Sequence, residues 1–340
     1  MTTFDNLRDR MAEKNGEIIK DQTVFEPQHV PKDVLHRDEQ LDSIADNISL
    51  FFTFGTEQIL LYGPNSTGKS LALNWFEEAM DELIDKPFEC VLATSTYDSN
   101  WQDILMEIGD KLGVENLHQG MSSGKMLDKI FSRYSSGFKL IIAIDEFDKL
   151  SEKSRSRLVR GLSRPHEITE DCPDVLTMVS SNDPMVIEEL DFGRDDRTHT
   201  SAFNPERVYF DDYDATELVD IFQQRFEKGL NDKYYDKSDV NYFSAKVRNE
   251  LQGDIRYGLM AVRRAIKKTA ESELKNIDRD IIDREIQNSL ENKLESALNS
   301  LGNRRIYKTL KCMCLVDEKS TKSIKNKYNS YYEDSMSTQT

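Results

Sequence analysis

Up to about residue 210, short apolar runs alternate with segments whose apolar residues recur at helical spacing. Such short apolar runs are typical of strands that are buried on both faces of a sheet. They cover residues 59–62, 89–94, 140–144 and 175–181. Strands separated by helices favour a parallel sheet with helices on both faces. We therefore predict an α/β domain in this part of the chain.

After Tyr213 the pattern becomes purely helical. Asp214 and Glu217 have the spacing of a capping box at a helix start, and the helix is expected to stop at Gly229. Two apolar stripes follow helical spacing: Leu218, Ile221, Phe222 and Phe226, then Leu290, Leu294, Leu298 and Leu301. We predict three parts: an α/β base domain over 1–212, a helical lid domain over 213–292 and a C-terminal segment over 293–340.

The composition is that of a globular protein with a substantial core. The chain has 340 residues, of which 38% are hydrophobic, and this length favours two or three domains. No apolar run approaches the roughly 18 residues needed to cross a bilayer. We therefore expect a soluble, cytoplasmic protein without membrane association. The four cysteines are spaced too irregularly for a disulfide framework or a zinc site: Cys90, Cys172, Cys312 and Cys314.

The charge is strongly negative but unevenly distributed. The net charge is −17, which argues against nucleic acid as a partner because phosphate contacts need Lys and Arg. Residues 300–330, however, carry eight Lys or Arg against two acids. This basic tail is either a set of phosphate contacts or a solvated helix pair. The candidate DNA contacts are Arg304, Arg305, Lys308, Lys311, Lys322 and Lys325.

A phosphate-binding motif lies directly after the first predicted strand. The sequence GPNSTGKS fits the Gly-x4-Gly-Lys-Ser pattern and opens a helix, which a plain glycine turn need not do. Backbone N–H groups of such a loop face phosphate oxygens, while Lys69 reaches the β and γ phosphates and Ser70 ligates Mg²⁺. Ser66 stands where many such loops have another glycine. The predicted nucleotide contacts here are Gly63, Pro64, Asn65, Ser66, Thr67, Gly68, Lys69, Ser70 and Leu71.

Two acids follow the third apolar run, in the sequence LIIAIDEF. Carboxylates at the C-terminal end of a parallel strand lie where ligands bind in open α/β sheets. Asp145 is expected to hold Mg²⁺ through water, and Glu146 to polarise the attacking water. The alternative is that both acids cap the next helix.

Two further side chains fit a nucleotide site. Asn182 follows the fourth run and could orient water, although an isolated Asn in this place is more often a turn former. Arg256 lies in the first turn of a helix that Asp254 is expected to cap. A cation there is unfavourable unless it answers a negative charge, which a triphosphate would supply.

Taken in order, these motifs resemble the AAA+ initiators of the archaeal Orc1/Cdc6 family over about residues 25–270. The resemblance implies an AAA+ P-loop NTPase fold: a parallel sheet, a small all-helical lid domain and a winged-helix segment. It also implies an ATP switch that marks replication origins and helps to load the replicative helicase onto DNA. In this resemblance Asp145 and Glu146 serve Mg²⁺ and hydrolysis, and Asn182 and Arg256 are two sensors of the nucleotide.

The same resemblance assigns further residues around the nucleotide. Tyr213 and Arg225 match positions that border it, and the segment from Val30 to Arg37 lies near the adenine. Arg197 is the preferred arginine finger for a neighbouring subunit and Arg194 the reserve. Each of these two arginines could equally be a solvated loop residue.

The chain departs from the family in two places. Only about fifty residues follow position 292, so the winged helix is expected to be partial, with little chain left for a recognition helix and wing. Residues 94–120 match a second DNA-contacting element of the family but contain only one cation, Lys111.

The leading hypothesis is a DNA-binding replication initiator with slow, switch-like ATPase activity that uses Mg²⁺. Its expected partners are duplex origin DNA, the replicative helicase or a full-length initiator, and a second copy through Arg197. The alternative is an AAA+ regulatory protein that binds initiators or other partner proteins and has little DNA binding of its own. A P-loop kinase for a metabolite is disfavoured by Glu146, the helical lid and Arg256.

Overall fold

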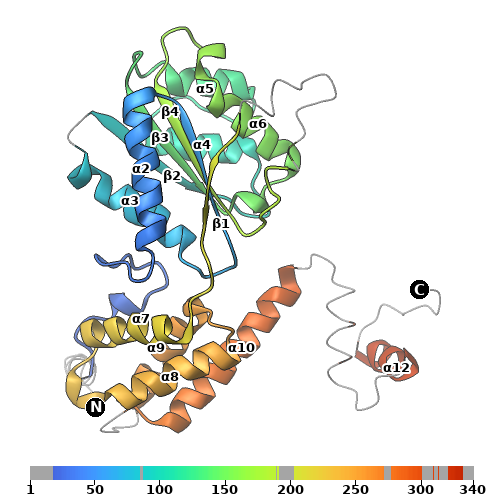
Figure 1. Cartoon of the computed structure of the whole chain (residues 1–340). Helices are drawn as coiled ribbons and strands as arrows, with labels where there is room; N and C mark the ends of the chain where they lie inside the picture. The colour runs from blue at the N-terminus through green and yellow to red at the C-terminus, as the bar shows by residue number, and fades with distance from the viewer. Residues whose placement is uncertain are drawn as a thin grey trace, which may run out of the picture.

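The structure is a computed structural model that describes residues 18–84, 87–188, 190, 203–271, 277–300, 309, 313 and 321–331. Two bodies lie along the chain, a sheet domain and a helical domain (Figure 1). Among the described residues, no helix combines the length and the hydropathy that a bilayer crossing requires.

The first body is built on a parallel sheet, as predicted, and this sheet has five strands. The strands are β1 (Glu57–Tyr62), β2 (Phe88–Thr94), β3 (Lys139–Asp145), β4 (Asp174–Ser181) and β5 (Glu206–Tyr209). Their order is β2-β3-β4-β1-β5, and every pair is parallel. The sequence pattern missed β5, because this edge strand has four residues of which one is buried.

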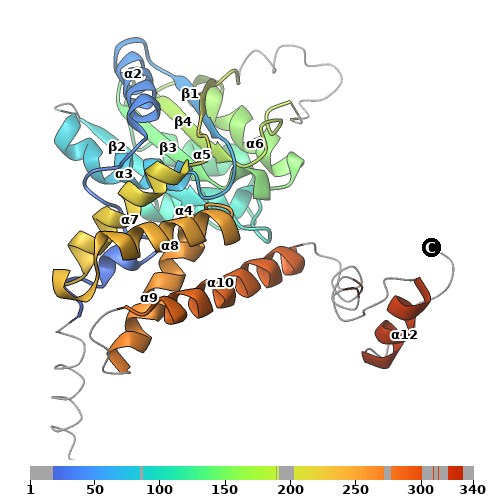
Figure 2. The same ribbon diagram turned by 60° about the horizontal axis from the view of Figure 1, so that its bottom comes forward.

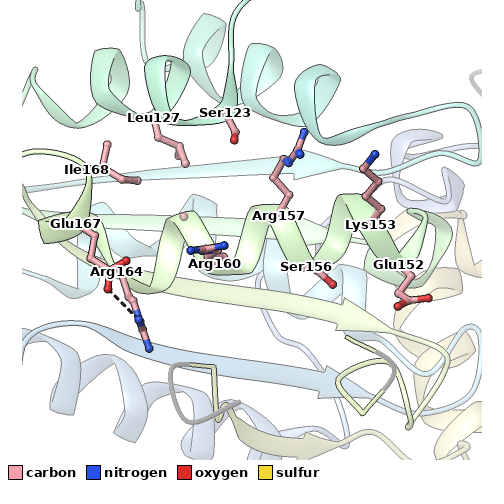
Figure 3. A pocket seen from close by; sticks show the side chains of 12 residues that line it. Ser123, Leu127, Glu152, Lys153, Ser156, Arg157, Arg160, Arg164, Glu167 and Ile168 are labelled. Carbon is pink, nitrogen blue, oxygen red and sulfur yellow. Dashed lines mark hydrogen bonds and ion pairs between the residues drawn. The ribbon is translucent and has the colours of Figure 1, made fainter. Parts of the chain in front are cut away.

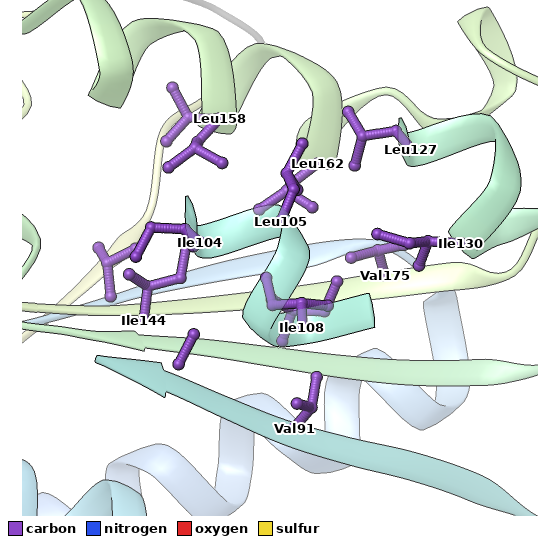
Figure 4. Close-up of a cluster of buried hydrophobic side chains, with 14 of the residues drawn as sticks. Val91, Ile104, Leu105, Ile108, Leu127, Ile130, Ile144, Leu158, Leu162 and Val175 are labelled. Carbon is purple, nitrogen blue, oxygen red and sulfur yellow. The ribbon is translucent and has the colours of Figure 1, made fainter. Parts of the chain in front are cut away.

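Helices cover both faces of the sheet, so successive buried residues of a strand belong to two different apolar clusters. Helices α2 (Asp38–Phe54) and α3 (Lys69–Leu83) lie on one face. The other face carries α4 (Trp101–Lys111), α5 (Ser123–Phe131) and α6 (Glu152–Ser163). Figure 4 shows the apolar cluster that these three helices form with the sheet. Leu60 belongs to this cluster, whereas Ile59 and Leu61 belong to the cluster under α2 and α3, as the two-residue period of a strand requires.

The second body consists of four helices that surround a separate apolar core. They are α7 (Ala215–Gly229), α8 (Lys237–Glu250), α9 (Ile255–Glu271) and α10 (Arg279–Ser300), and α7 begins with a capping box at Asp214. Helix α10 runs past residue 292, and in its last turns Leu294 is 55% exposed. We refer to this body as the lid. In Figure 1 its helices lie below the sheet domain, and in Figure 2 the same helices are turned toward the viewer.

Short helices and one separate helix complete the described chain. The 3₁₀ turns are η1 (Thr23–Phe25), η2 (Phe147–Lys149), η3 (Pro165–Glu167) and η4 (Asp232–Tyr234). Helix α12 (Thr321–Tyr331) is the longest element described after α10. The other residues expected to complete a partial winged helix lie mostly outside the described residues, so that part of the fold stays a prediction.

Residues 18–25 pack against the lid rather than against the sheet. Val24 and Phe25 are buried in the lid core, and the backbone N–H of Lys20 donates to the carbonyl of Gly229 at 2.8 Å. A Cβ atom at Gly229 would lie 2.3 Å from a ring carbon of Phe25 and 2.5 Å from a methyl carbon of Val24. The absence of a side chain at this position therefore lets the N-terminal segment seat against α7.

We predict that Gly229→Ala lowers the free energy of unfolding by about 1–3 kcal/mol, because the added methyl overpacks this contact. Gly124→Ala is the control, since a Cβ atom at Gly124 meets no atom within 4 Å. It should be neutral or stabilising by up to about 1 kcal/mol through helix propensity. Urea denaturation of both variants measures the difference. Equal stabilities would contradict the packing described here.

Candidate functional site

The loop after β1 has the backbone geometry of a phosphate cradle. Gly63 has φ 143°, and a Cβ atom there would lie 2.1 Å from the carbonyl oxygen of Phe210, so only glycine fits. Gly68 has φ 98° and precedes the first residue of α3. A Cβ atom at Gly68 would lie 2.8 Å from the hydroxyl oxygen of Tyr213. The loop thus delivers the N-terminus of α3 at the carboxyl edge of the sheet, where its free N–H groups can bind anions.

Lys69 folds back under this loop. Its Nζ donates to the carbonyl oxygen of Gly63 at 2.7 Å and also to that of Pro64, and the residue is buried. Burial lowers the pKa of Lys69 to about 8, against the opposing effect of the nearby carboxylates of Asp148 and Asp145. The ammonium is therefore poorly solvated, and it lies near two acids beside the loop that is expected to bind phosphate.

The two predicted acids stand at the end of β3, beside the loop. Asp145 is buried, and its Oδ1 accepts hydrogen bonds from the Ser180 hydroxyl and, at 3.0 Å, from the backbone N–H of Glu146. Glu146 has φ 54°, a left-handed conformation that is costly for a residue with a side chain. Its carboxylate pairs with Lys149. The acids are thus fixed separately, Asp145 by the sheet and Glu146 by the following turn.

Asn182 follows β4 and is held by an acid that the sequence analysis did not single out. Asp148 accepts from the backbone N–H of Asn182 at 3.1 Å and from its Nδ2 at 3.4 Å. The turn η2 brings Asp148 back to the sheet edge three residues after Asp145. The Asp-x-x-Asp spacing from Asp145 to Asp148, directly after a buried strand, could have indicated this role.

The lid reaches the phosphate loop directly. The Ser66 hydroxyl donates to Asp254 Oδ1 at 2.7 Å, and Arg256 Nη2 donates to the same hydroxyl at 3.4 Å. Asp254 is buried just before α9, and Lys293 of α10 lies 3.4 Å from its Oδ2. The residue that replaces a common glycine therefore contacts the lid. The cation at the start of α9 lies beside the loop.

Arg37 joins the loop to the segment between the two bodies. Its Nε donates to the carbonyl of Thr67 at 2.8 Å and its Nη2 to that of Asp211 at 2.7 Å. The guanidinium carbon lies 3.6 Å from the ring centroid of Tyr213. Arg37 is buried by these contacts and fixes the position of the loop.

Two other residues, Arg225 in α7 and Val30 after η1, are expected near the nucleotide. Arg225 is buried and donates to the carbonyl of Val24 at 3.0 Å, and burial lowers its pKa to about 10. Val30 is half-buried. Contacts of Val30, Arg37, Tyr213 and Arg225 with a nucleotide stay predictions.

Several predicted residues lie outside the described residues. These are Arg194, Arg197, Arg304, Arg305, Lys308 and Lys311. Lys322 and Lys325 belong to α12, where Lys325 is half-buried. The arginine finger and the DNA contacts of the tail therefore stay predictions.

The donor set of the site fits Mg²⁺ bound together with a phosphate. Ser70 is exposed in the first turn of α3, and Asp145 offers a carboxylate at the end of β3. Within the described ranges, no group of three or more His, Cys, Asp or Glu side chains could hold a metal alone. Mg²⁺ commonly uses one or two protein oxygens and completes its shell with phosphate and water.

Comparison with known proteins identifies the fold and the relatives. Residues 54–182 match the model of the AAA domain. Over 271 residues the chain is 27% identical to the ORC1-type DNA replication protein 3 of Haloarcula marismortui, covering 77% of this chain and 69% of that one. The chain spans about two thirds of the length of the curated relatives that it matches.

Solved structures agree with this assignment. The ORC1 protein of Aeropyrum pernix in complex with DNA superposes with a TM-score of 0.69 and 19% identity, covering 92% of this chain and 81% of that one. The ORC2 protein of the same organism in ADPNP–ADP complexes gives a TM-score of 0.64 and 16% identity, covering 79% and 72%. The expected resemblance is confirmed: residues 54–182 match the AAA domain, and the chain is similar in sequence to ORC1-type DNA replication proteins.

Proposed function

We propose that this chain is an ATP-dependent, DNA-binding replication initiator in which ATP sets a conformation. One observation carries the proposal: a phosphate loop, an acidic pair and a lid arginine meet at one sheet edge, with loop and lid in contact. The ORC1-type relatives and the fold shared with an ORC1 protein in complex with DNA support the replication role. Such a protein would act in the cytoplasm on origin-type duplex DNA, with a replicative helicase or a full-length initiator as partner.

The residues of the loop would hold the phosphates of ATP or ADP. Lys69 and the first-turn N–H groups of α3 are donors, and burial strengthens their interaction with charge. Ser70 and Asp145 would hold Mg²⁺, which neutralises phosphate charge when bound. The ADPNP–ADP complexes of a protein with this fold support the identity of the ligand.

The acidic edge would support slow hydrolysis. Glu146 would take a proton from the attacking water, and Asn182, positioned by Asp148, would orient that water. In the present arrangement the Glu146 carboxylate pairs with Lys149. Because Lys149 competes with the attacking water for this carboxylate, we expect turnover to be slow.

The switch would work by exchange of hydrogen-bond partners. Lys69 now donates to carbonyl oxygens and Arg256 to the Ser66 hydroxyl, which are neutral acceptors. Phosphate oxygens are charged acceptors and bind these cations more strongly. Since Arg256 lies in the first turn of α9, its transfer to phosphate would shift the lid relative to the loop. Arg197 of a neighbouring copy would complete the site.

The second candidate is an AAA+ regulator that binds other initiators or partner proteins without binding DNA, and the net charge of −17 favours it. Fluorescence anisotropy of labelled duplex DNA, with and without ATP across a salt series, separates the two. An initiator should bind with an affinity that falls steeply as salt rises. If no binding occurs at low salt, the protein is the AAA+ regulator and not the initiator.

We predict that Lys69→Ala weakens ATP binding about 10- to 100-fold at pH 7, because charge-assisted hydrogen bonds to phosphate are lost. The pH dependence gives an independent signature. Above the pKa of about 8, the free protein carries a neutral Lys69, so binding must take up a proton. The wild-type dissociation constant should therefore rise by up to about tenfold per pH unit between pH 8 and 10.

Isothermal titration calorimetry over this pH range measures both effects. Lys233→Ala, at an exposed lid position, is the control and should retain wild-type affinity and its pH dependence. Unchanged ATP affinity in Lys69→Ala would remove the site assignment.

We predict that Glu146→Gln binds ATP with an affinity within about threefold of wild type but hydrolyses it about 10²- to 10⁴-fold more slowly, since it cannot act as a general base. Phosphate release under single-turnover conditions gives the rate. Glu152→Gln, an exposed acid of α6, should leave the rate unchanged. Full activity in Glu146→Gln would place the catalytic base elsewhere.

A further inference from the structure

Helices α5 and α6 enclose a groove on the sheet domain that is separate from the nucleotide site. It has a volume of about 790 Å³, and none of the phosphate-loop or acidic-edge residues lines it. Figure 3 shows α6 running along the groove, with Lys153 and Arg157 extending toward α5. The groove is thus a second, independent concave surface of the protein.

The cations of α6 form one line along this groove. Lys153, Arg157 and Arg160 follow one another at intervals of four and three residues, which places them on one face of α6, and Arg164 follows directly after the end of the helix. With a rise of 1.5 Å per residue, the line from Lys153 to Arg160 is about 10 Å long. It can therefore follow several phosphates, which advance by about 3.4 Å along the axis of each DNA strand.

Three of these cations are available to a ligand. Lys153, Arg157 and Arg160 are exposed, and no described carboxylate lies within ion-pair distance of any of them. Arg164 pairs with Glu167 at 2.8 Å, at one end of the groove. The Arg157 guanidinium lies 5.0 Å from the ring centroid of Trp101, which orients it. Uncompensated cations in a row repel one another, and a polyanion would relieve this repulsion.

The opposite wall of the groove adds neutral donors. Ser123 and Gly124 line it at the start of α5, and the Ser122 hydroxyl caps that helix by accepting from the N–H of Lys125. First-turn N–H groups and serine hydroxyls are common phosphate donors. The two walls therefore offer complementary contacts to the same kind of group.

The lining favours a nucleic-acid backbone over an acidic protein. Protein interfaces depend on exposed apolar anchors at their centre. The apolar residues of this groove cannot serve as such anchors, because Leu127 is 2% exposed and Ile168 is half-buried. Arginine predominates among the cations, and its planar fork suits phosphate.

We propose that the α5–α6 groove binds the phosphate backbone of duplex DNA. The proposal deepens the proposed function and rests on it. The groove is a positively charged surface on the sheet domain of a chain whose net charge is −17. Contacts of this kind position DNA without reading its sequence.

The test compares two triple variants that remove the same charge. The groove variant is Lys153→Gln, Arg157→Gln, Arg160→Gln, and the control variant is Lys233→Gln, Lys237→Gln, Lys267→Gln at exposed lid positions. Anisotropy of a short labelled duplex is measured in a salt series with ATP present. The groove variant should bind at least about tenfold more weakly at low salt, with a slope of log K against log salt that is shallower by about 2 to 3. ATP affinity and thermal unfolding confirm that both variants are folded.

The outcomes separate the groove from the function. If wild type binds DNA and the two triple variants have equal affinity and slope, the groove assignment is wrong and the initiator function stands. If wild type does not bind DNA at low salt, both the groove assignment and the initiator function are wrong. If polyglutamate binds to wild type, duplex DNA does not, and the groove variant loses polyglutamate binding, the groove belongs to an acidic protein partner and the proposal is overturned.

Discussion

Parallel pairing of three buried strands is the constraint on which the candidate site depends. Tyr62 of β1 pairs with Ser181 of β4, and Ile144 of β3 pairs with Val179, so the three strands end at nearly the same level. Candidate functional residues lie directly at or after the end of each strand: the phosphate loop, the Asp145–Glu146 pair and Asn182. The apolar runs that bury these strands on both faces therefore also set the distances between the functional groups. A shift of one strand by one residue would reverse its faces and disperse the site.

The second interaction of consequence couples the loop to the lid. Ser66, Asp254 and Arg256 join segments that are 188 and 190 residues apart, and Arg37 connects the same loop to the segment before α7. Both bodies have their own apolar cores, so each can remain intact while the contact between them changes. A ligand shifts a conformational equilibrium only if it binds one arrangement of the protein more strongly than the other. A phosphate loop that also contacts the lid meets this requirement, because a ligand on the loop would change the loop's contacts with the lid.

The sequence predicted what is local or periodic. The four buried strands, the capping box at Asp214 and the phosphate loop follow from patterns that span at most about eight residues. It did not predict β5, whose pairing with β1 comes from tertiary position rather than from its four residues. Asp148 was missed because its role appears only when a turn brings it to Asn182. The basic groove was missed because the net charge of the whole chain conceals a line of cations on one helix face.

The central claim is that a triphosphate takes Lys69 and Arg256 away from their protein partners. The most direct measurement is a crystal structure with Mg²⁺ and a non-hydrolysable ATP analogue. We predict phosphate oxygens within hydrogen-bond distance of Lys69 Nζ and the Arg256 guanidinium, with Arg256 withdrawn from the Ser66 hydroxyl. A nucleotide bound away from this loop, or one that leaves the contacts of Ser66, Asp254 and Arg256 unchanged, would contradict the account.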